Sequence, residues 1–266
     1  MKPQLTLGVS LKMYFGYQQT LEWSRQIAEI VKNHPVIRDR HRDGLVELFV
    51  FPSLPAIAGA IEAFRGTSVN VGAQNMFWED AGAYTGEVSG AMLREMGCSY
   101  VEIGHAERRR YFAENDKQIA DKTTAALRNS LIPVICIGEA ERCTAAQAIE
   151  QAVAQAQQAL GPAEKAGLSG DAILAYEPQW AIGAKEPASA EFIGEVCEGL
   201  AARLSSSSAH GDRRVIYGGS AGPGLLTQLG NRTGGLFLGR FSHQPAAYKA
   251  ILDEASALLL STANRS

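Results

Sequence analysis

Short apolar runs alternate along the chain with longer segments in which apolar residues recur at the helical period. The runs are brief and apolar on both faces, as strands that are covered on both sides should be. They comprise residues 5–11, 46–51, 69–73, 100–103, 132–137, 173–176, 214–217 and 235–238. Strands that alternate with helices are typical of a parallel sheet. Eight such units predict an α/β fold closed into a single (β/α)8 barrel.

Helical candidates lie between the runs at residues 18–31, 116–128 and 145–160, the last of which is rich in Ala and Gln. The serine run at 205–208 is the one low-complexity tract, and no change of composition marks a linker. We therefore predict one domain over residues 1–266. A basic insertion at 34–43 is interpreted as a solvated loop.

Charge and cysteine content exclude several function classes. The 266 residues carry a formal net charge of −3, so no global basic field exists to attract nucleic acid or an anionic membrane. The four cysteines form no C-x-x-C pair and no His stands at metal-ligand spacing, so we expect free thiols and no metal site. The first apolar run is too short for a signal peptide or a membrane span. We expect a cytoplasmic protein.

In a barrel of this kind the active site lies at the carboxyl ends of the strands, so the residue that follows each run becomes a candidate. This rule selects two glycine turns after the seventh and eighth runs, Gly218-Gly219-Ser220 and Gly239-Arg240. Among the side chains after the other runs it selects Lys12, Gln74, Asn75, His105, Glu139 and Glu177.

Glu177 ends the sixth run among Tyr176, Trp180 and Ile182. Apolar surroundings desolvate a carboxylate and raise its pKa, which suits removal of a proton from carbon. The alternative interpretation is a structural ion pair with a neighbouring cation.

His105 precedes residues 106–112, which read as the first turns of a helix. A helix amino terminus disfavours the imidazolium, and a neutral imidazole can donate a hydrogen bond to a carbonyl and move a proton between adjacent oxygens. Lys12 ends the first run, where its ammonium could stabilise a phosphate and a developing negative charge. The alternatives are a structural histidine and a surface lysine.

The glycine turns suit a phosphate, because glycine lets backbone amides approach an anion closely. A Gly-Gly-Ser segment in isolation is more often an ordinary tight turn. In barrels, however, phosphate sites use the loops after strands seven and eight, and phosphate binding becomes the better interpretation.

Taken together, the segments at the strand ends resemble the motifs of the triosephosphate isomerase family. They occur in family order over nearly the whole chain, and their combination is highly specific. The segments are Leu11-Lys12-Met13, Val71-Gly-Ala-Gln-Asn75, Tyr84-Thr-Gly-Glu87, Ile103-Gly-His-Ala-Glu-Arg-Arg109, Cys136-Ile-Gly-Glu139, Ala175-Tyr-Glu-Pro-Gln-Trp-Ala-Ile-Gly183 and Tyr217-Gly-Gly-Ser220.

The resemblance implies a TIM barrel in which Glu177 is the base, His105 the electrophile and Lys12 the group that stabilises charge, with Glu107 behind them. It also implies a lid over residues 178–188, which includes Pro178, Trp180, Ala184 and Pro187 and closes over the phosphate to exclude water. The family is dimeric. The loop after the third run, which extends from Gln74 past Thr85, is expected to reach the active site of the partner subunit. Substrate contacts are implied for Gly183, Gly218, Gly219, Ser220 and Gly239.

The chain departs from the family pattern at several of these positions. Ser10 stands where the family has an Asn that touches the substrate, and Tyr14 replaces the Asn that closes that motif. Ala106 stands where a Ser usually holds the glutamate of the open state. Pro187 is expected to stiffen the end of the lid.

The last phosphate turn is Gly239-Arg240 where the family has Gly-Gly. We expect the Arg240 guanidinium at the rim of the phosphate site, with a solvent-facing arginine as the alternative. Together with Ser10 and the lid end, this turn resembles tetrulose-phosphate isomerases of erythritol catabolism, relatives within the same family.

The leading hypothesis is an isomerase that interconverts glyceraldehyde 3-phosphate and dihydroxyacetone phosphate through a cis-enediol(ate), as a homodimer without cofactor or metal. The second hypothesis keeps this chemistry but interconverts L-erythrulose 1-phosphate and D-erythrulose 4-phosphate. The third, from another class, is a catalytically silent sugar-phosphate sensor. Because Lys12, His105 and Glu177 are all present, the enzyme hypotheses are favoured.

Overall fold

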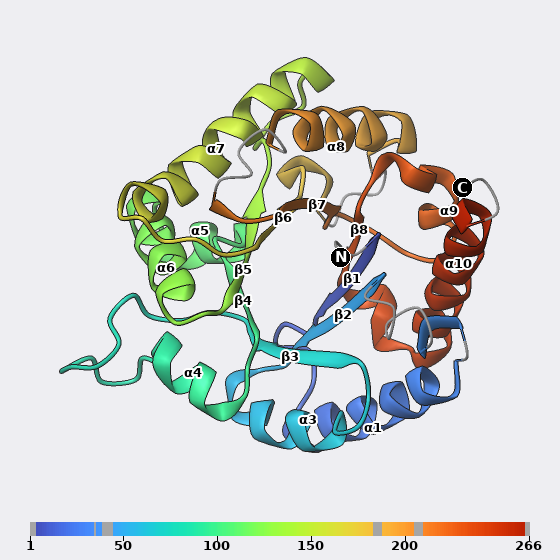
Figure 1. The fold of residues 1–266 in the computed structure, drawn as a ribbon, viewed down its shortest axis with the longest axis horizontal. Helices are drawn as coiled ribbons and strands as arrows, with labels where there is room; N and C mark the ends of the chain where they lie inside the picture. The colour runs from blue at the N-terminus through green and yellow to red at the C-terminus, as the bar shows by residue number, and fades with distance from the viewer. Residues whose placement is uncertain (1–3, 35, 39–44, 183–187, 205–209, 264–266) are drawn as a thin grey trace.

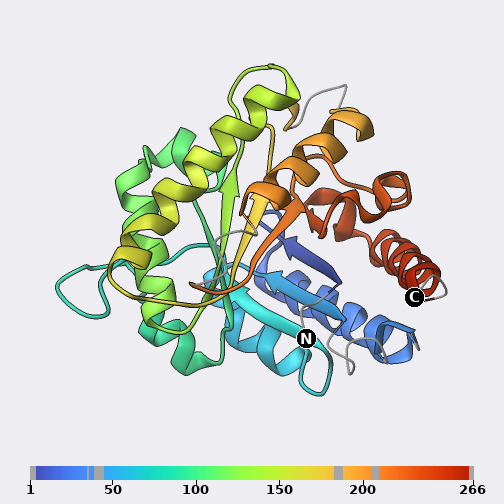
Figure 2. The ribbon, with the colours of Figure 1, turned by 45° about the horizontal axis from the view of Figure 1, so that its top comes forward.

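In a computed structural model the chain forms a closed barrel of eight parallel strands in sequence order, with strand β1 paired to β8 to complete the ring. Figure 1 shows the strands at the centre and the helices around them, and Figure 2 shows the same arrangement from an inclined direction. The structure describes residues 4–34, 36–38, 45–182, 188–204 and 210–263, with residues 262 and 263 described by their backbone alone. The predicted (β/α)8 barrel is confirmed.

The strands match the predicted runs to within one residue at each end. They are β1 (Leu5–Ser10), β2 (Val46–Phe51), β3 (Val69–Ala73), β4 (Tyr100–Ile103), β5 (Ile132–Ile137), β6 (Ala172–Tyr176), β7 (Arg213–Tyr217) and β8 (Gly235–Leu238). The agreement arises because each run ends at the residue where the chain leaves the buried sheet.

Helices and short 3-10 turns connect the strands. The helices are α1 (Tyr17–Asn33), α3 (Ile57–Ala63), α4 (Gly90–Met96), α5 (Ala106–Phe112), α6 (Asp116–Arg128), α7 (Ala145–Lys165), α8 (Ala190–Leu204), α9 (Leu225–Leu229) and α10 (Pro245–Ala263). The 3-10 turns are η1 (Leu54–Ala56), η2 (Gln179–Ala181), η4 (Gly230–Arg232) and η5 (Arg240–His243).

Local sequence explains where the two best-predicted helices begin. Capping boxes begin α6 at Asn115 and α7 at Thr144. In each, the side chain of the cap residue accepts a hydrogen bond from the backbone amide of the Gln three residues later, and the side chain of that Gln accepts one from the backbone amide of the cap residue. Helix α7 runs beyond the predicted end at residue 160 and continues through Pro162 to Lys165. Burial of Ala163 helps to hold this last turn against the core.

The barrel interior differs from the prediction that every strand is apolar on both faces. An aromatic cluster fills its middle, with Phe49 stacked on Tyr100 at a centroid distance of 4.9 Å. At the amino-terminal end of the strands, however, Glu47 accepts from Arg214 and from the Tyr100 hydroxyl. This part-buried ion pair is tolerated because both Glu47 oxygens accept hydrogen bonds.

Two connections stand out from the regular ring. The segment between β3 and α4 projects away from the barrel (Figure 1), and residues 79–87 in it are exposed. The insertion at 34–43 is described only at 34 and 36–38, where Ile37 is buried and His34 Nε2 lies 3.1 Å from Asp253 of α10. This part is packed, which the interpretation as a solvated loop missed. Within the described ranges, no helix combines the length and the apolar composition needed to cross a membrane.

Candidate active site

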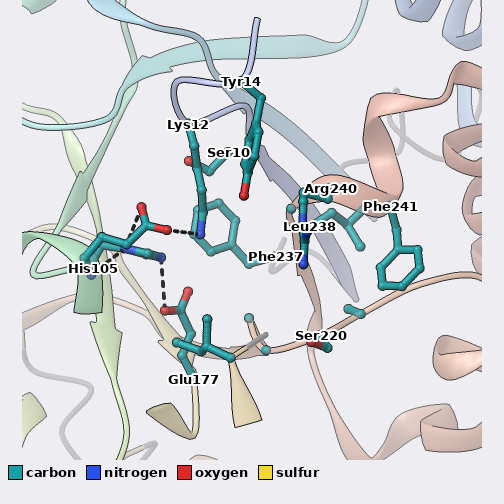
Figure 3. A pocket seen from close by; sticks show the side chains of 16 residues that line it. Ser10, Lys12, Tyr14, His105, Glu177, Ser220, Phe237, Leu238, Arg240 and Phe241 are labelled. Carbon is teal, nitrogen blue, oxygen red and sulfur yellow. Dashed lines mark hydrogen bonds and ion pairs between the residues drawn. The ribbon is translucent and has the colours of Figure 1, made fainter. Parts of the chain in front are cut away.

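The carboxyl ends of the strands surround a cavity of about 230 Å³. Its lining brings together most of the residues that the strand-end rule selected, from β1, β4, β6, β7 and β8 (Figure 3). The lining residues include Ser10, Lys12, Tyr14, His105, Glu107, Glu177, Gly218, Gly219, Ser220, Gly239, Arg240 and Phe241.

Glu177 follows β6 and is only 3% exposed. Its backbone is fixed by a 2.7 Å hydrogen bond from its amide to the carbonyl of Ile137. Two glycines make room for it: a Cβ on Gly138 would overlap the Glu177 carbonyl, and one on Gly218 would lie 2.7 Å from the side chain. The neighbouring strand ends therefore determine where this carboxylate sits.

Burial raises the pKa of Glu177 to about 8, and the negative charge of Glu102 adds to the shift. Lys12 and the Cys136 thiol act in the opposite direction but do not cancel it. The Glu177 oxygen Oε2 lies 3.5 Å from His105 Nε2 and accepts no hydrogen bond in the described part of the chain. A desolvated carboxylate with a free oxygen facing a cavity is poised to take up a proton.

His105 caps the amino terminus of α5, as the sequence predicted. Its Nδ1 accepts a 3.1 Å hydrogen bond from the Glu107 amide. Burial lowers the pKa of His105 to about 4, and the positive charge of Lys12 contributes. The imidazole is therefore neutral at physiological pH, and because Nδ1 is the acceptor, the proton resides on Nε2, which faces the cavity.

Lys12 adopts a left-handed backbone with φ of +49°, which costs a non-glycine residue about 1–2 kcal/mol. Its carbonyl compensates by accepting from Gln74 Nε2 at 2.9 Å and from the Ser53 hydroxyl at 3.0 Å. Strand ends β1, β2 and β3 thus cooperate to turn this one side chain over the cavity.

The Lys12 ammonium donates to Glu107 Oε1 at 2.7 Å. Burial by itself would lower the pKa of Lys12, but the hydrogen bond and the negative charge of Glu107 outweigh it and raise the pKa. The lysine is therefore held as a cation beside the cavity.

Of the two turns predicted to bind phosphate, the one that ends at Ser220 lies across the cavity from Ser10 (Figure 3), whereas Gly239-Arg240 follows β8, the strand that pairs with β1. The backbone is open at Gly239, where nothing lies within 4 Å of an added Cβ. Arg240 is exposed, lines the cavity, and forms no hydrogen bond or ion pair with the described residues. The Arg240 guanidinium therefore lies at the rim of the cavity, where it could donate to an anion.

Of the predicted lid, residues 178–182 and 188 are described, whereas Gly183, Ala184 and Pro187 lie outside the described residues. Trp180 of η2 donates its indole nitrogen to Glu139 Oε1 at 2.8 Å. Glu139, which the strand-end rule also selected, does not line the cavity; it accepts from Tyr176 and Trp180 instead. It anchors the start of the predicted lid.

Other predicted residues lie outside the cavity. Ala106 is the first residue of α5 and has no polar group to hold Glu177. Asn75 accepts from Lys122, which also pairs with buried Glu114 and so braces the segment after α5. Thr85 is exposed on the projecting segment.

Sequence reasoning missed Glu102, an inward-facing residue of β4. Its carboxylate is 3% exposed and accepts a 2.8 Å hydrogen bond from the Ser10 hydroxyl. Ser10 lines the cavity, and its hydroxyl donates to this acid. A charged residue in the middle of an apolar strand was the available signal.

No group of His, Cys, Asp and Glu side chains within the described ranges could hold a metal ion. The cavity instead combines a free carboxylate, a neutral imidazole, a lysine cation and glycine amides. Such a set can remove a carbon-bound proton beside a carbonyl while holding an anionic group.

A family profile described as triosephosphate isomerase matches residues 5–255 of the chain. The chain belongs to this family. It is also similar in structure to triosephosphate isomerase from Bartonella henselae, with a TM-score of 0.75, 25% identity, and coverage of 95% of this chain and 99% of that one. It is a sugar-phosphate isomerase of the triosephosphate isomerase family.

Within the family, relatives of two kinds are similar to the chain. An L-erythrulose-1-phosphate isomerase from Pectobacterium atrosepticum is 56% identical over 255 residues, which are 96% of this chain and 97% of that protein. A second L-erythrulose-1-phosphate isomerase, from Mesorhizobium japonicum, is 38% identical over 95% of this chain and 98% of its own length. A triosephosphate isomerase from Moorella thermoacetica is 44% identical, but over 69% of this chain and 74% of its own. The similarity favours the tetrulose hypothesis over the triose one.

Proposed function

We propose that the protein interconverts L-erythrulose 1-phosphate and D-erythrulose 4-phosphate. The observation that carries this proposal is the 56% identity, over nearly the full length of both chains, to an enzyme named for the first of these substrates. The departures at Ser10 and Arg240 support it, because both residues line the cavity where a longer substrate must fit.

The proposed reaction uses the groups that line the cavity. Counting from the phosphate-bearing carbon, Glu177 takes the proton from carbon 3, and the electrons form a double bond between carbons 2 and 3 while the oxygen at carbon 2 gains negative charge. Lys12 stabilises this charge. His105 donates from Nε2 to the oxygens and moves a proton between them, and Glu177 returns its proton to carbon 2.

The phosphate is held by the glycine turns after β7 and β8 and by Arg240. Amides of Gly219 and Ser220 offer the donors, and glycine allows the close approach. Lid closure over residues 178–188 removes water, so that the enediolate is protonated and does not eliminate phosphate.

The test is kcat/KM for L-erythrulose 1-phosphate against dihydroxyacetone phosphate, followed by proton NMR in D2O, which also reports deuterium at the reacting carbon. We expect the tetrulose phosphate to be preferred by about 10²-fold or more, since a site fitted to one substrate binds its transition state selectively. A preference for the triose phosphate would refute the proposal and leave the triose hypothesis. No turnover of either would point to a silent sugar-phosphate sensor.

Arg240 gives a prediction for the phosphate end. We expect Arg240→Gly to raise KM by about tenfold with a smaller change in kcat, because one exposed charge-assisted hydrogen bond to the phosphate is lost. Arg240→Lys, which keeps the charge, should lie between the variant and the native enzyme. A change below about twofold in KM would make Arg240 a solvent-facing residue.

We further propose a homodimer. Beside the active site lies a second cavity of about 590 Å³, whose outer wall carries exposed apolar side chains. Met13 is 91% exposed, Tyr111 65% and Phe112 67%. An exposed apolar groove of this kind is typical of a protein interface.

The projecting segment suits this groove as its partner. Tyr84 packs against Phe77 at a centroid distance of 4.5 Å, and Asp80 anchors the loop to Arg128 of α6 at 3.0 Å. The loop is thus organised by its own chain while Tyr84 and Thr85 remain exposed. Gln74 lines the groove and also holds Lys12, so a loop seated there would contact residues that position the active site.

Sedimentation at micromolar concentration should therefore give about twice the chain mass of 28.5 kDa. We expect Phe112→Glu to yield a monomer with strongly reduced kcat, because a charge in an apolar interface opposes association. Leu260→Glu, at an exposed leucine of α10, is the matched control and should remain dimeric. A native monomer with full activity would contradict the proposal.

A further inference from the structure

Glu102 is a buried acid to which the reaction above assigns no part. It lies on the inner face of β4, and its Oε2 accepts from the Ser10 hydroxyl at 2.8 Å. No hydrogen bond to its other oxygen, Oε1, is formed among the described residues, and Oε1 is not one of the fully buried atoms that lack a partner. Because Glu102 lines a cavity, this oxygen can accept a hydrogen bond from a ligand there.

Glu102 lies beside the active-site cavity and does not line that cavity itself. It lines the second cavity, and Ser10, Lys12, His105 and Glu107 line both cavities. Ser10 and Ser220 lie on opposite sides of the pocket in Figure 3. A substrate with its phosphate beside Ser220 and its reacting carbons beside His105 therefore points its far end toward the wall that Ser10 and Glu102 form.

The far end is where the two substrate classes differ. A tetrulose phosphate carries a terminal hydroxymethyl group on the carbon from which the proton is removed, whereas a triose phosphate has only hydrogen there. A hydroxyl both donates and accepts, so it can pair with a carboxylate or a carboxylic acid. Burial raises the pKa of Glu102 to about 7, while the Ser10 hydroxyl lowers it, so both forms occur near neutral pH.

We propose that the Ser10–Glu102 pair binds the terminal hydroxymethyl group of a four-carbon substrate and thereby selects substrate length. This inference rests on the proposed function. Ser10 orients the carboxyl group from one oxygen and leaves Oε1 for the substrate hydroxyl. A three-carbon substrate has no terminal hydroxyl at this place, so it cannot form the hydrogen bond to Oε1 and is bound less well.

Glu102 also acts on the base, and the experiment must separate the two effects. The negative charge of Glu102 raises the pKa of Glu177. The charged groups that shift the pKa of Glu102 itself are Lys12, Glu107 and Arg108. A change at Glu102 therefore alters Glu177 for every substrate alike. Recognition of the hydroxyl, in contrast, is lost only for a substrate that has it.

The experiment compares two substrates on the dimeric enzyme, L-erythrulose 1-phosphate and its 4-deoxy analogue, which lacks only the terminal hydroxyl. For the native enzyme we expect a kcat/KM ratio of about 10² in favour of the hydroxylated substrate. Glu102→Leu should reduce this ratio to below about threefold. The change in Glu177 affects both substrates equally and cancels in the ratio, so the ratio reports only the contact with the terminal hydroxyl. An unchanged ratio, or a native ratio near one, would overturn the inference.

Glu102→Gln keeps a group that bonds to a hydroxyl but removes the charge. We expect this variant to retain most of the kcat/KM ratio between the two substrates. The acidic limb of the pH profile of kcat/KM should move to lower pH, because loss of the Glu102 charge lowers the pKa of Glu177. A Gln variant that loses the whole ratio would contradict hydroxyl recognition by a neutral acceptor. Should the Leu variant not fold, Ser10→Ala should lower the ratio by about tenfold.

Tyr100→Phe is the matched control, because it removes a buried hydroxyl two residues earlier on the same strand and should leave the ratio unchanged. A native enzyme that does not turn over L-erythrulose 1-phosphate refutes the proposed function itself. A native enzyme that does, but whose ratio survives Glu102→Leu, refutes only this inference.

Discussion

Glu177→Gln should lower kcat by about 10³- to 10⁴-fold while the affinity for a phosphorylated ligand changes little. The amide keeps the shape of the side chain but cannot accept the carbon-bound proton. In the proposed mechanism the phosphate is bound by the glycine turns and Arg240, which lie at other strand ends. Steady-state kinetics and the inhibition constant of a non-reacting phosphorylated acid would measure the two effects.

The same carboxylate makes the rate depend on pH. Because burial raises the pKa of Glu177 to about 8 in the free protein, the base is protonated below that pH, and kcat/KM should fall as pH is lowered through this range. Glu141→Gln, at an exposed carboxyl after β5, is the control and should behave as the native enzyme. Near-normal turnover by the Glu177→Gln variant would remove this residue from the mechanism.

His105→Gln should lower kcat/KM by about 10²-fold, since the amide can donate a hydrogen bond but cannot pass a proton from one oxygen to the other. Removal of the carbon-bound proton remains possible through Glu177. Deuterium from solvent should therefore enter the substrate faster, relative to product formation, than in the native enzyme. NMR in D2O measures both rates in one sample.

Two outcomes bear on this assignment. His34→Gln changes a histidine that pairs with Asp253 of α10, away from the cavity lining, and should leave both rates unaltered. Equal losses of deuterium exchange and of product formation in the His105→Gln variant would show that the histidine acts on carbon deprotonation, and would contradict a shuttle between oxygens.

The sequence by itself determined the barrel and most of the cavity lining. Strands buried on both faces read as apolar runs, and a parallel barrel brings all their carboxyl ends to one face. The position of a residue just after a run was therefore enough to bring Lys12, His105 and Glu177 together. The starts of α6 and α7 lie at the predicted residues, because the capping box that begins each helix is local in sequence.

Only the tertiary structure decided the state of these residues. The tautomer of His105 depends on a hydrogen bond from a backbone amide. The left-handed backbone conformation of Lys12 depends on side chains that follow β2 and β3. The pKa of Glu177 depends on burial by neighbouring strands. Ser10 and Glu102 are 92 residues apart, so no local pattern links them. The strand-end rule selects the residue after a strand and therefore passes over Glu102, which lies inside β4.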